Sequence, residues 1–200
     1  MRRLFAFLVI ALAGIAPAHG FARDVEDVLG RIKTGKRVPI EHVATLMRAS
    51  ERWCYIERDG ACSWADIYLE VSADRATYEI GNAWNDEIDV TFTDHGVFQE
   101  GRYICETGYD WVPTVRAERR SDGTALKGRE LAALKAEITA NRASDTVDCF
   151  DYVYKGKDEA AETITLLQRE YTDGVTDPVN DVTVTLHFNA EKAAALTYYY

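Results

Sequence analysis

Two helical stripes of apolar residues open the part of the chain that follows the first twenty residues. The first stripe predicts a helix over about residues 24–34, because its members recur at i, i+3, i+4 and i+7. The second predicts a helix over about residues 39–51, where Pro39 suits the first turn. The two stripes consist of Val25, Val28, Leu29 and Ile32, and of Ile40, Val43, Ala44, Leu46 and Met47. Together they predict an N-terminal helical hairpin whose apolar side needs a cover.

From about residue 54 the apolar period changes from 3.6 to 2, which is typical of antiparallel strands joined by short turns. This pattern predicts a sheet over about residues 54–120 and again over about 146–188. One helix, over about 128–142, interrupts it with a stripe of Leu131, Leu134 and Ile138. The last stretch, Ala190–Tyr200, fits helix in its first half and strand in its second.

The pattern as a whole predicts an α+β fold. The helical hairpin is followed by a curled antiparallel β-sheet, which the single helix interrupts. The sheet is predicted to be a meander, and closure into a barrel-like form is one possibility. The sequence contains no internal repeat and no long linker, and about 180 residues suffice for one domain with a real core. We therefore expect a single domain over residues 19–200.

The first residues form the pattern of an export signal. Arg2 and Arg3 precede the apolar run Leu4–Ile15, and Ala16-Pro17-Ala18 supplies a small-residue exit. We predict a cleaved Sec-type signal peptide over residues 1–18, with cleavage after residue 20 or 22 as alternatives. The protein is then periplasmic or secreted. The run is short for a membrane span, and Ile15 stands where a lipid-attached cysteine would be, so we expect no stable membrane anchor.

The charge balance narrows the class of partner. The chain has 33 Asp and Glu against 23 Lys and Arg, a formal net charge of −10. An acidic surface disfavours nucleic acid and anionic lipid as partners and tolerates cationic ones. The partner is unknown from sequence, and a cationic protein, peptide or metal ion is the expected type.

An even number of cysteines in an exported chain predicts disulfides. The favoured pairs are Cys54–Cys62 and Cys105–Cys149, although four cysteines allow three connectivities. A tight Asp59-Gly60 turn would set Cys54 opposite Ala65, so the first bond needs a loop or bulge. The second bond would close a loop of about 44 residues. By lowering the chain entropy of the unfolded state, it would stabilise the fold by about 4 kcal/mol.

Aromatic and acidic clusters provide the candidate binding residues. Trp64 and Tyr68 share one strand face with Asp66 and Glu70, which indicates either a binding surface or a second core under the helices. The possible binding surface comprises Trp64, Tyr68, Trp84 and Trp111. Asp86, Glu87 and Asp89 are weak calcium candidates, because they lack the EF-hand spacing and solvated turn acids have the same composition. We favour no metal and no cofactor.

No catalytic residue is predicted. The histidines, including His187 on a polar strand face, lack any motif that pairs them with a nucleophile or metal. The sequence therefore favours an exported, disulfide-bonded, non-catalytic binding or interaction protein. One alternative is a cell-envelope hydrolase with a site assembled from distant acids and a histidine. A second alternative is a small outer-membrane β-barrel, consistent with the aromatic C-terminus.

Overall fold

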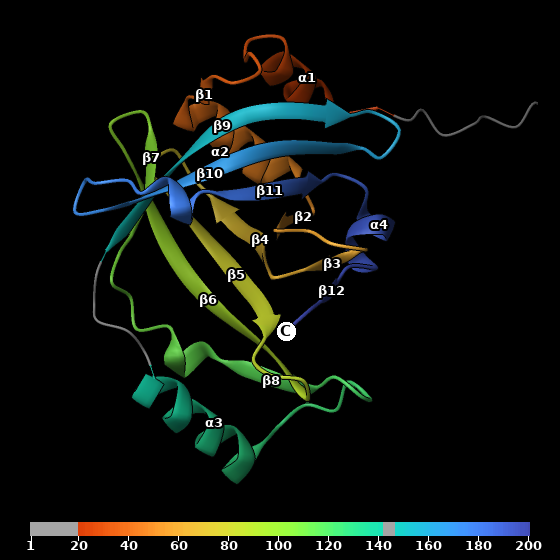
Figure 1. Ribbon diagram of the computed structural model, residues 1–200, viewed down its shortest axis with the longest axis vertical. Helices are drawn as coiled ribbons and strands as arrows, with labels where there is room; N and C mark the ends of the chain where they lie inside the picture. Colours follow the sequence, from red (N-terminus) through yellow and green to blue (C-terminus); the bar gives the residue numbers. More distant parts are fainter. Residues whose placement is uncertain (1–19, 142–146) are drawn as a thin grey trace, which may run out of the picture.

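The computed structural model describes residues 20–141 and 147–200 of the chain (Figure 1). The expected signal peptide over 1–18 lies outside the described residues. So do residue 142, the expected end of the interrupting helix, and residue 146, the expected start of the second run of strands.

Eight strands form a closed antiparallel barrel in which each strand pairs with the next one along the chain. The barrel closes where β11 pairs with β2 and where β7 pairs with β9. Its strands are β2 Arg52–Tyr55, β4 Trp64–Val71, β5 Arg75–Ala83, β6 Ile88–Gln99, β7 Tyr103–Glu106, β9 Asp148–Asp158, β10 Thr163–Thr172 and β11 Val182–His187. The predicted α+β class with a curled antiparallel meander is thus observed, and the curl is a complete barrel.

Short strands and turns decorate the barrel. β1 Arg37–Val38 pairs with β9, and β8 Arg116–Arg119 pairs with the first part of β6. β3 Ala61–Cys62 and β12 Thr197–Tyr198 form a separate parallel pair. The last stretch is therefore both helix and strand, because α4 Ala190–Ala194 precedes β12. Two 3₁₀ turns, η1 Val112–Thr114 and η2 Pro178–Asn180, lie in the connections.

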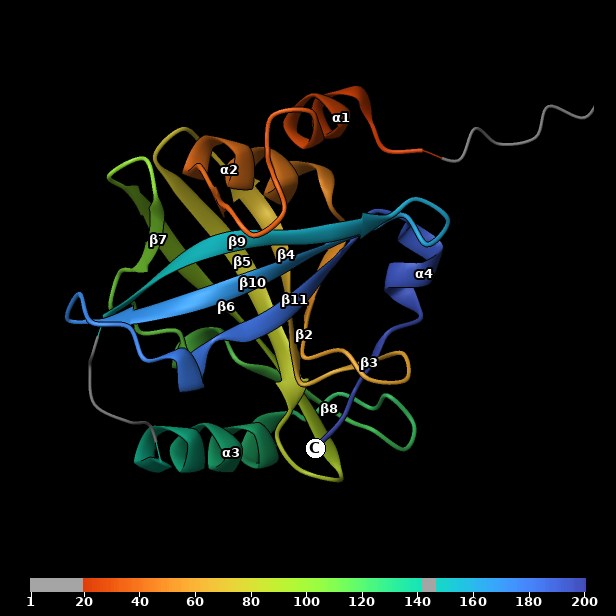
Figure 2. The same ribbon diagram turned by 45° about the horizontal axis from the view of Figure 1, so that its top comes forward.

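Three longer helices lie on two opposite sides of the barrel. α1 Arg23–Leu29 and α2 Ile40–Ala49 lie together on one side, and α3 Gly128–Asn141 lies on the other (Figures 1 and 2). The first helix is shorter than the predicted 24–34, because the chain turns at Gly30. No helix in the described ranges is long and apolar enough to cross a membrane.

The main core lies between the helical hairpin and the inside of the barrel. Val25, Val43 and Leu46 from the two helices are fully buried against the large inward side chains of the strands. The fully buried strand residues include Trp53, Tyr152, Ile164, Leu166, Val184 and Leu186. A second, smaller core lies under α3, where Leu134 and Ile138 pack with buried residues of β6, η1 and β8.

The face of β4 that points inward is the one that carries Asp66. Trp64, Asp66 and Tyr68 face the barrel interior, whereas Leu69 on the other face is 57% exposed. A register irregularity between Tyr68 and Glu70 then shifts the alternation, so that Val71 packs on the core. Trp64 and Tyr68 therefore line the inside of the barrel.

Two disulfides are present, Cys54–Cys62 and Cys105–Cys149, the pairs that the sequence favours. Cys105 and Cys149 are register partners across β7 and β9, so this bond joins the two strands at a closure of the barrel. Cys54 does lie opposite Ala65, as a tight turn requires, but Ile56 has a positive φ of 50°. The hairpin therefore bends, and the Cα atoms of Cys54 and Cys62 lie 5.2 Å apart. Two disulfides are compatible with an exported protein.

Candidate functional site: a cavity inside the barrel

The inward side chains leave a cavity of about 190 Å³ in the barrel, beside the main core. It is smaller than the roughly 300–1,000 Å³ of a typical drug-sized site, so its ligand would be small. Six aromatic side chains line it: Tyr55, Trp64, Tyr68, Tyr78, Phe150 and Tyr152. Three acidic side chains, Asp66, Glu106 and Glu170, face the same space. The described residues that line the cavity include no Lys, Arg or His.

The most buried acidic group of the cavity is the Asp66 carboxyl, in a residue only 6% exposed. Its Oδ2 atom accepts a 2.8 Å hydrogen bond from the Tyr55 hydroxyl. Its Oδ1 atom is buried without a hydrogen-bond partner among the described residues. Burial raises the pKa of Asp66 to about 7, opposed by the Tyr55 hydrogen bond and assisted by repulsion from Asp94. Asp66 is therefore a carboxyl group that the fold leaves without a compensating charge.

A hydrogen-bonded network fixes the side chains around Asp66. The Gln168 amide donates to the Tyr152 hydroxyl at 3.0 Å and to the Tyr55 hydroxyl at 3.3 Å. Gln168 and Tyr152 are register partners on β10 and β9, so the sheet itself places the two groups together. Because the Tyr55 hydroxyl accepts from Gln168, its proton is directed to Asp66. The network orients the carboxyl but supplies no positive charge.

Glu106 and Glu170 extend the acidic lining toward the less buried part of the cavity. Glu106 Oε2 accepts a long 3.4 Å hydrogen bond from the Asp148 backbone N–H. Burial raises the pKa of Glu106 to about 7, and the charges of Asp94, Asp148 and Glu170 add to the increase. Burial together with the charge of Asp148 also raises the pKa of Glu170, whose carboxylate accepts a 3.0 Å hydrogen bond from Asn180. Repulsion among these acids favours the neutral forms or a bound cation.

The aromatic wall presents ring faces and edges in a fixed arrangement. Tyr55 and Trp64 stack with ring centroids 4.7 Å apart and planes 10° from parallel. Tyr68 and Tyr78, which are register partners on β4 and β5, have centroids 5.6 Å apart. Rings in such pairs attract each other and hold their positions, and their faces attract cations.

Comparison of the chain with protein-family models, curated proteins and solved structures finds no match.

The four aromatic residues predicted as a binding surface divide into two groups. Trp64 and Tyr68 line the cavity. Trp84 and Trp111 pack instead on the core under α3, where Trp111 stacks on Phe92 with centroids 4.1 Å apart. The Trp84 indole N–H donates to Glu137 on α3 at 3.3 Å. The structure thus places the four residues in two separate clusters, one at the cavity and one under α3.

The weak calcium candidates lie on the surface near β8. Asp86, Glu87 and the arginines at 119 and 120 line a shallow hollow there. Arg120 Nε lies 3.2 Å from Asp89 Oδ1, so a protein cation already accompanies that carboxylate. Among the described residues, these three acids do not form a group that could hold a metal ion.

The sequence analysis did not single out Tyr55, Glu106, Tyr152, Gln168 or Glu170. They come from four strands, β2, β7, β9 and β10, and they face one cavity only because the barrel closes. One signal was available: Asp66 alternates with Trp64 and Tyr68, so the strand period alone placed an acid between two aromatic residues on one face.

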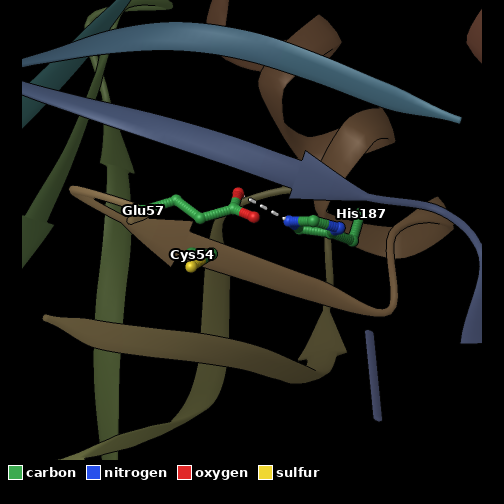
Figure 3. A group of neighbouring side chains, drawn as sticks. All are labelled: Cys54, Glu57 and His187. Carbon is green, nitrogen blue, oxygen red and sulfur yellow. Dashed lines mark hydrogen bonds and ion pairs between the residues drawn. The ribbon is translucent and has the colours of Figure 1, made fainter. Parts of the chain in front are cut away.

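A separate cluster lies outside the barrel, where the side chains of Cys54, Glu57 and His187 converge (Figure 3). The His187 Nε2 atom is 2.9 Å from Glu57 Oε2, and the two residues are 130 positions apart in sequence. His187 is 7% exposed and is not among the residues that line the cavity. A histidine and a carboxylate therefore do come within hydrogen-bond distance, but beside a disulfide rather than beside the acids of the barrel.

Proposed function

We propose that the protein binds a small organic cation, a substituted ammonium ion, inside its barrel. The observation that carries the proposal is the uncompensated Asp66 carboxyl, which faces an aromatic cavity together with Glu106. A buried carboxylate is strongly disfavoured unless a positive charge accompanies it. A bound cation would supply that charge, donate a hydrogen bond to the free Oδ1 atom from an N–H or O–H group, and lower the pKa of both acids.

The aromatic wall supports a cation in preference to a neutral polar ligand. Quaternary and alkylated ammonium groups bind in cages of aromatic rings, where each ring face contributes about 0.5–2 kcal/mol. Tyr55, Trp64, Tyr68 and Tyr78 line the same cavity as Asp66 and would contact a cation bound there. The alkyl groups of such a cation would also bury apolar surface against Ile80 and Ile104, which share the lining.

The expected location agrees with such a role. The predicted signal peptide, the two disulfides and the acidic composition together support an exported binding domain of the periplasm or the medium. Residues 1–18 would be removed on export, and the closed barrel would remain as the ligand carrier.

The first test measures binding of choline to the purified chain at pH 8 by calorimetry and by tryptophan fluorescence. Choline should bind with a Kd on the order of 0.1 mM or tighter. Its neutral isostere 3,3-dimethylbutan-1-ol, which has the same shape without the charge, should bind at least about tenfold more weakly. Equal affinity for the two compounds would show that the cavity does not recognise the positive charge. If neither compound binds, the proposal is wrong for this ligand class.

Variants locate the binding in the cavity. Asp66→Asn keeps the acceptor for Tyr55 and removes the charge, and should weaken choline binding by roughly 10–100-fold. Asp86→Asn removes an equal charge from the exposed loop. This control should bind choline as the unaltered chain does. If both variants lose affinity equally, the attraction is a general effect of net charge and not of the cavity.

A second candidate function is acid–base catalysis. Two carboxyl groups with pKa near 7 in one cavity are the arrangement that proton transfer at neutral pH needs. The cell-envelope hydrolase alternative requires acids and a histidine in one site. The cavity provides the acids, but His187 does not line it. Turnover of cell-wall glycan fragments that is lost in Asp66→Asn and in Glu106→Gln would favour the enzyme over the carrier.

The outer-membrane alternative shares its closed eight-stranded barrel with the observed fold. The distribution of side chains supports the carrier instead, because a membrane barrel needs an apolar outer band. Here the largest fully buried strand side chains, such as Trp53 and Leu166, point inward, and outward positions carry polar groups such as Glu79, Arg169 and Thr185 as well as the apolar Leu69. Recovery of the mature protein from the periplasm without detergent would agree with this argument.

A further inference from the structure

Three metal-binding atoms converge at the cluster shown in Figure 3: one ligand atom each from Cys54, Glu57 and His187 lie within 4.8 Å of one another. The sulfur of Cys62 is bonded to that of Cys54 and would be a fourth potential ligand once the disulfide is open. Two cysteines, one histidine and one carboxylate are a ligand set that Zn²⁺ accepts in tetrahedral geometry.

We propose that Cys54, Cys62, Glu57 and His187 form a zinc site in the reduced protein, and that the disulfide and the metal exclude each other. This inference is independent of the cation proposed for the barrel. In the oxidised protein the sulfur atoms carry no negative charge, and Glu57 pairs with His187. In the reduced protein two thiolates become available, and the same carboxylate and imidazole would turn to the metal.

The backbone holds the ligands in place without help from the disulfide. Cys54 on β2 is a register partner of Thr185 on β11, two residues before His187. The Ile56 N–H donates to the Thr183 carbonyl at 2.9 Å, which fixes the chain directly before Glu57. The Ser63 N–H donates to the Tyr55 carbonyl at 2.9 Å and keeps Cys62 beside β2. Opening of the S–S bond would therefore separate the sulfur atoms by side-chain rotation alone.

The surroundings suit a closed structural site. Both cysteines are fully buried, and the C-terminal segment covers them with Leu196 and Tyr198. The ring of Tyr198 occupies the space beside Gly81, where any larger residue would meet it. Zinc bound there would connect β2, β3 and β11, as the disulfide connects the first two. The second disulfide offers a comparison inside the same chain, because no described histidine or acid completes a ligand group with Cys105 or Cys149.

The reaction balances with a phosphine as reductant. The phosphine takes up the oxygen of one water molecule as it becomes phosphine oxide, and the disulfide receives two electrons and two protons as two thiols. Zn²⁺ then displaces the two thiol protons and coordinates the resulting thiolates. Reoxidation by a disulfide-forming oxidant would release the metal.

The test begins with a titration of phosphine-reduced, full-length protein with Co²⁺, a coloured substitute for Zn²⁺, in the absence of oxygen. One equivalent should bind with the intense visible bands of a tetrahedral site and a thiolate charge-transfer band, and Zn²⁺ should displace it. The oxidised protein should show neither signal. The double variant Cys54→Ser/Cys62→Ser should bind about 100-fold or more weakly, beyond the effect of losing an outer-shell partner. The double variant Cys105→Ser/Cys149→Ser should bind like the unaltered chain.

A second measurement separates the site from binding by an unfolded chain. The reduced protein is alkylated with iodoacetamide with and without zinc, and the four cysteines are mapped by mass spectrometry. Zinc should protect Cys54 and Cys62 and leave the labelling of Cys105 and Cys149 unchanged. For His187→Ala, the zinc concentration that gives the same protection should be at least about tenfold higher. Equal labelling of all four cysteines, with or without zinc, or an octahedral cobalt spectrum would overturn the proposal.

Discussion

The Tyr55 hydroxyl donates a 2.8 Å hydrogen bond to Oδ2 of Asp66, while Oδ1 of the same carboxyl is buried without a partner among the described residues. The fold thus orients this acid and does not neutralise it. Burial dominates the pKa of Asp66, which lies at about 7. Without a bound cation, the ionised form of Asp66 therefore opposes folding.

Asp66→Asn should stabilise the ligand-free protein at high pH. The pKa of Asp66 is higher in the folded state than the usual value of about 3.9 in the unfolded state, so the folded state holds the proton more tightly. Its contribution to stability is complete below pH 4 and is lost as the pH rises to about 7. At pH 8 the variant should exceed the unaltered chain by roughly 2–4 kcal/mol in free energy of unfolding. At pH 4 the two should agree within about 1 kcal/mol.

Urea denaturation at pH 4, 6 and 8 measures this difference, with Asp86→Asn as the exposed control. The control should run parallel to the unaltered chain at all three values. A difference for Asp66→Asn that does not change with pH would mean that burial does not raise the pKa of Asp66.

Much of the fold follows from local pattern, and the face of β4 shows where local pattern fails. Pro39 and the apolar stripe predict α2 correctly, since its N-cap is Pro39 and its C-cap is Ser50. On β4, however, Ile67 and Leu69 form the more apolar face, and yet Asp66 points inward. Which face of a strand is buried depends on the elements that pack against it around the barrel. The residues of β4 alone do not determine this choice.

The candidate site could be predicted only in part for a related reason. Trp64 and Tyr68 were identified because they share a strand face with an acid, a relationship within one strand. Glu106 and Glu170 reach the same cavity through pairing of β7 with β9 and of β9 with β10. The contact of Glu57 with His187 spans 130 residues. Such pairings depend on closure of the whole barrel and have no local signature.

Gly96→Ala should destabilise the barrel and reduce the cavity. A Cβ atom at Gly96 on β6 would lie 2.5 Å from Cγ1 of Ile104, a cavity-lining residue. Overpacking of this kind costs about 1–3 kcal/mol. Thermal and urea denaturation should show a loss in that range. Gly156→Ala is the matched control on β9, because nothing lies within 4 Å of its added Cβ atom. Equal losses for both would point to a general effect of glycine replacement.

Phe21 should contribute to stability and should remain in the mature protein. Its ring packs edge-on against Phe188 with centroids 5.1 Å apart, and the residue is 9% exposed within the main core. Phe21→Ala should lower the free energy of unfolding by about 2–4 kcal/mol. Signal-peptide cleavage after residue 18 or 20 retains this ring, and cleavage after residue 22 removes it. N-terminal sequencing of the exported protein should accordingly find Phe21, and its absence would argue that the Phe21–Phe188 contact is dispensable.

Cation binding in the barrel should release protons and weaken as the pH falls. Asp66 and Glu106, each with a pKa of about 7 in the free protein, must lose their protons to attract the cation. Below pH 7 each protonated group lowers the affinity by up to about tenfold per pH unit, so choline should bind roughly 10–100-fold more weakly at pH 6 than at pH 8. Calorimetry at pH 7 in buffers of different ionisation enthalpy should detect up to about one proton released, because each of the two groups is about half protonated at that pH. Asp66→Asn should remove about half of this release, because Glu106 continues to titrate. An affinity that stays constant from pH 6 to pH 8 would show that the two carboxyl groups take no part in binding.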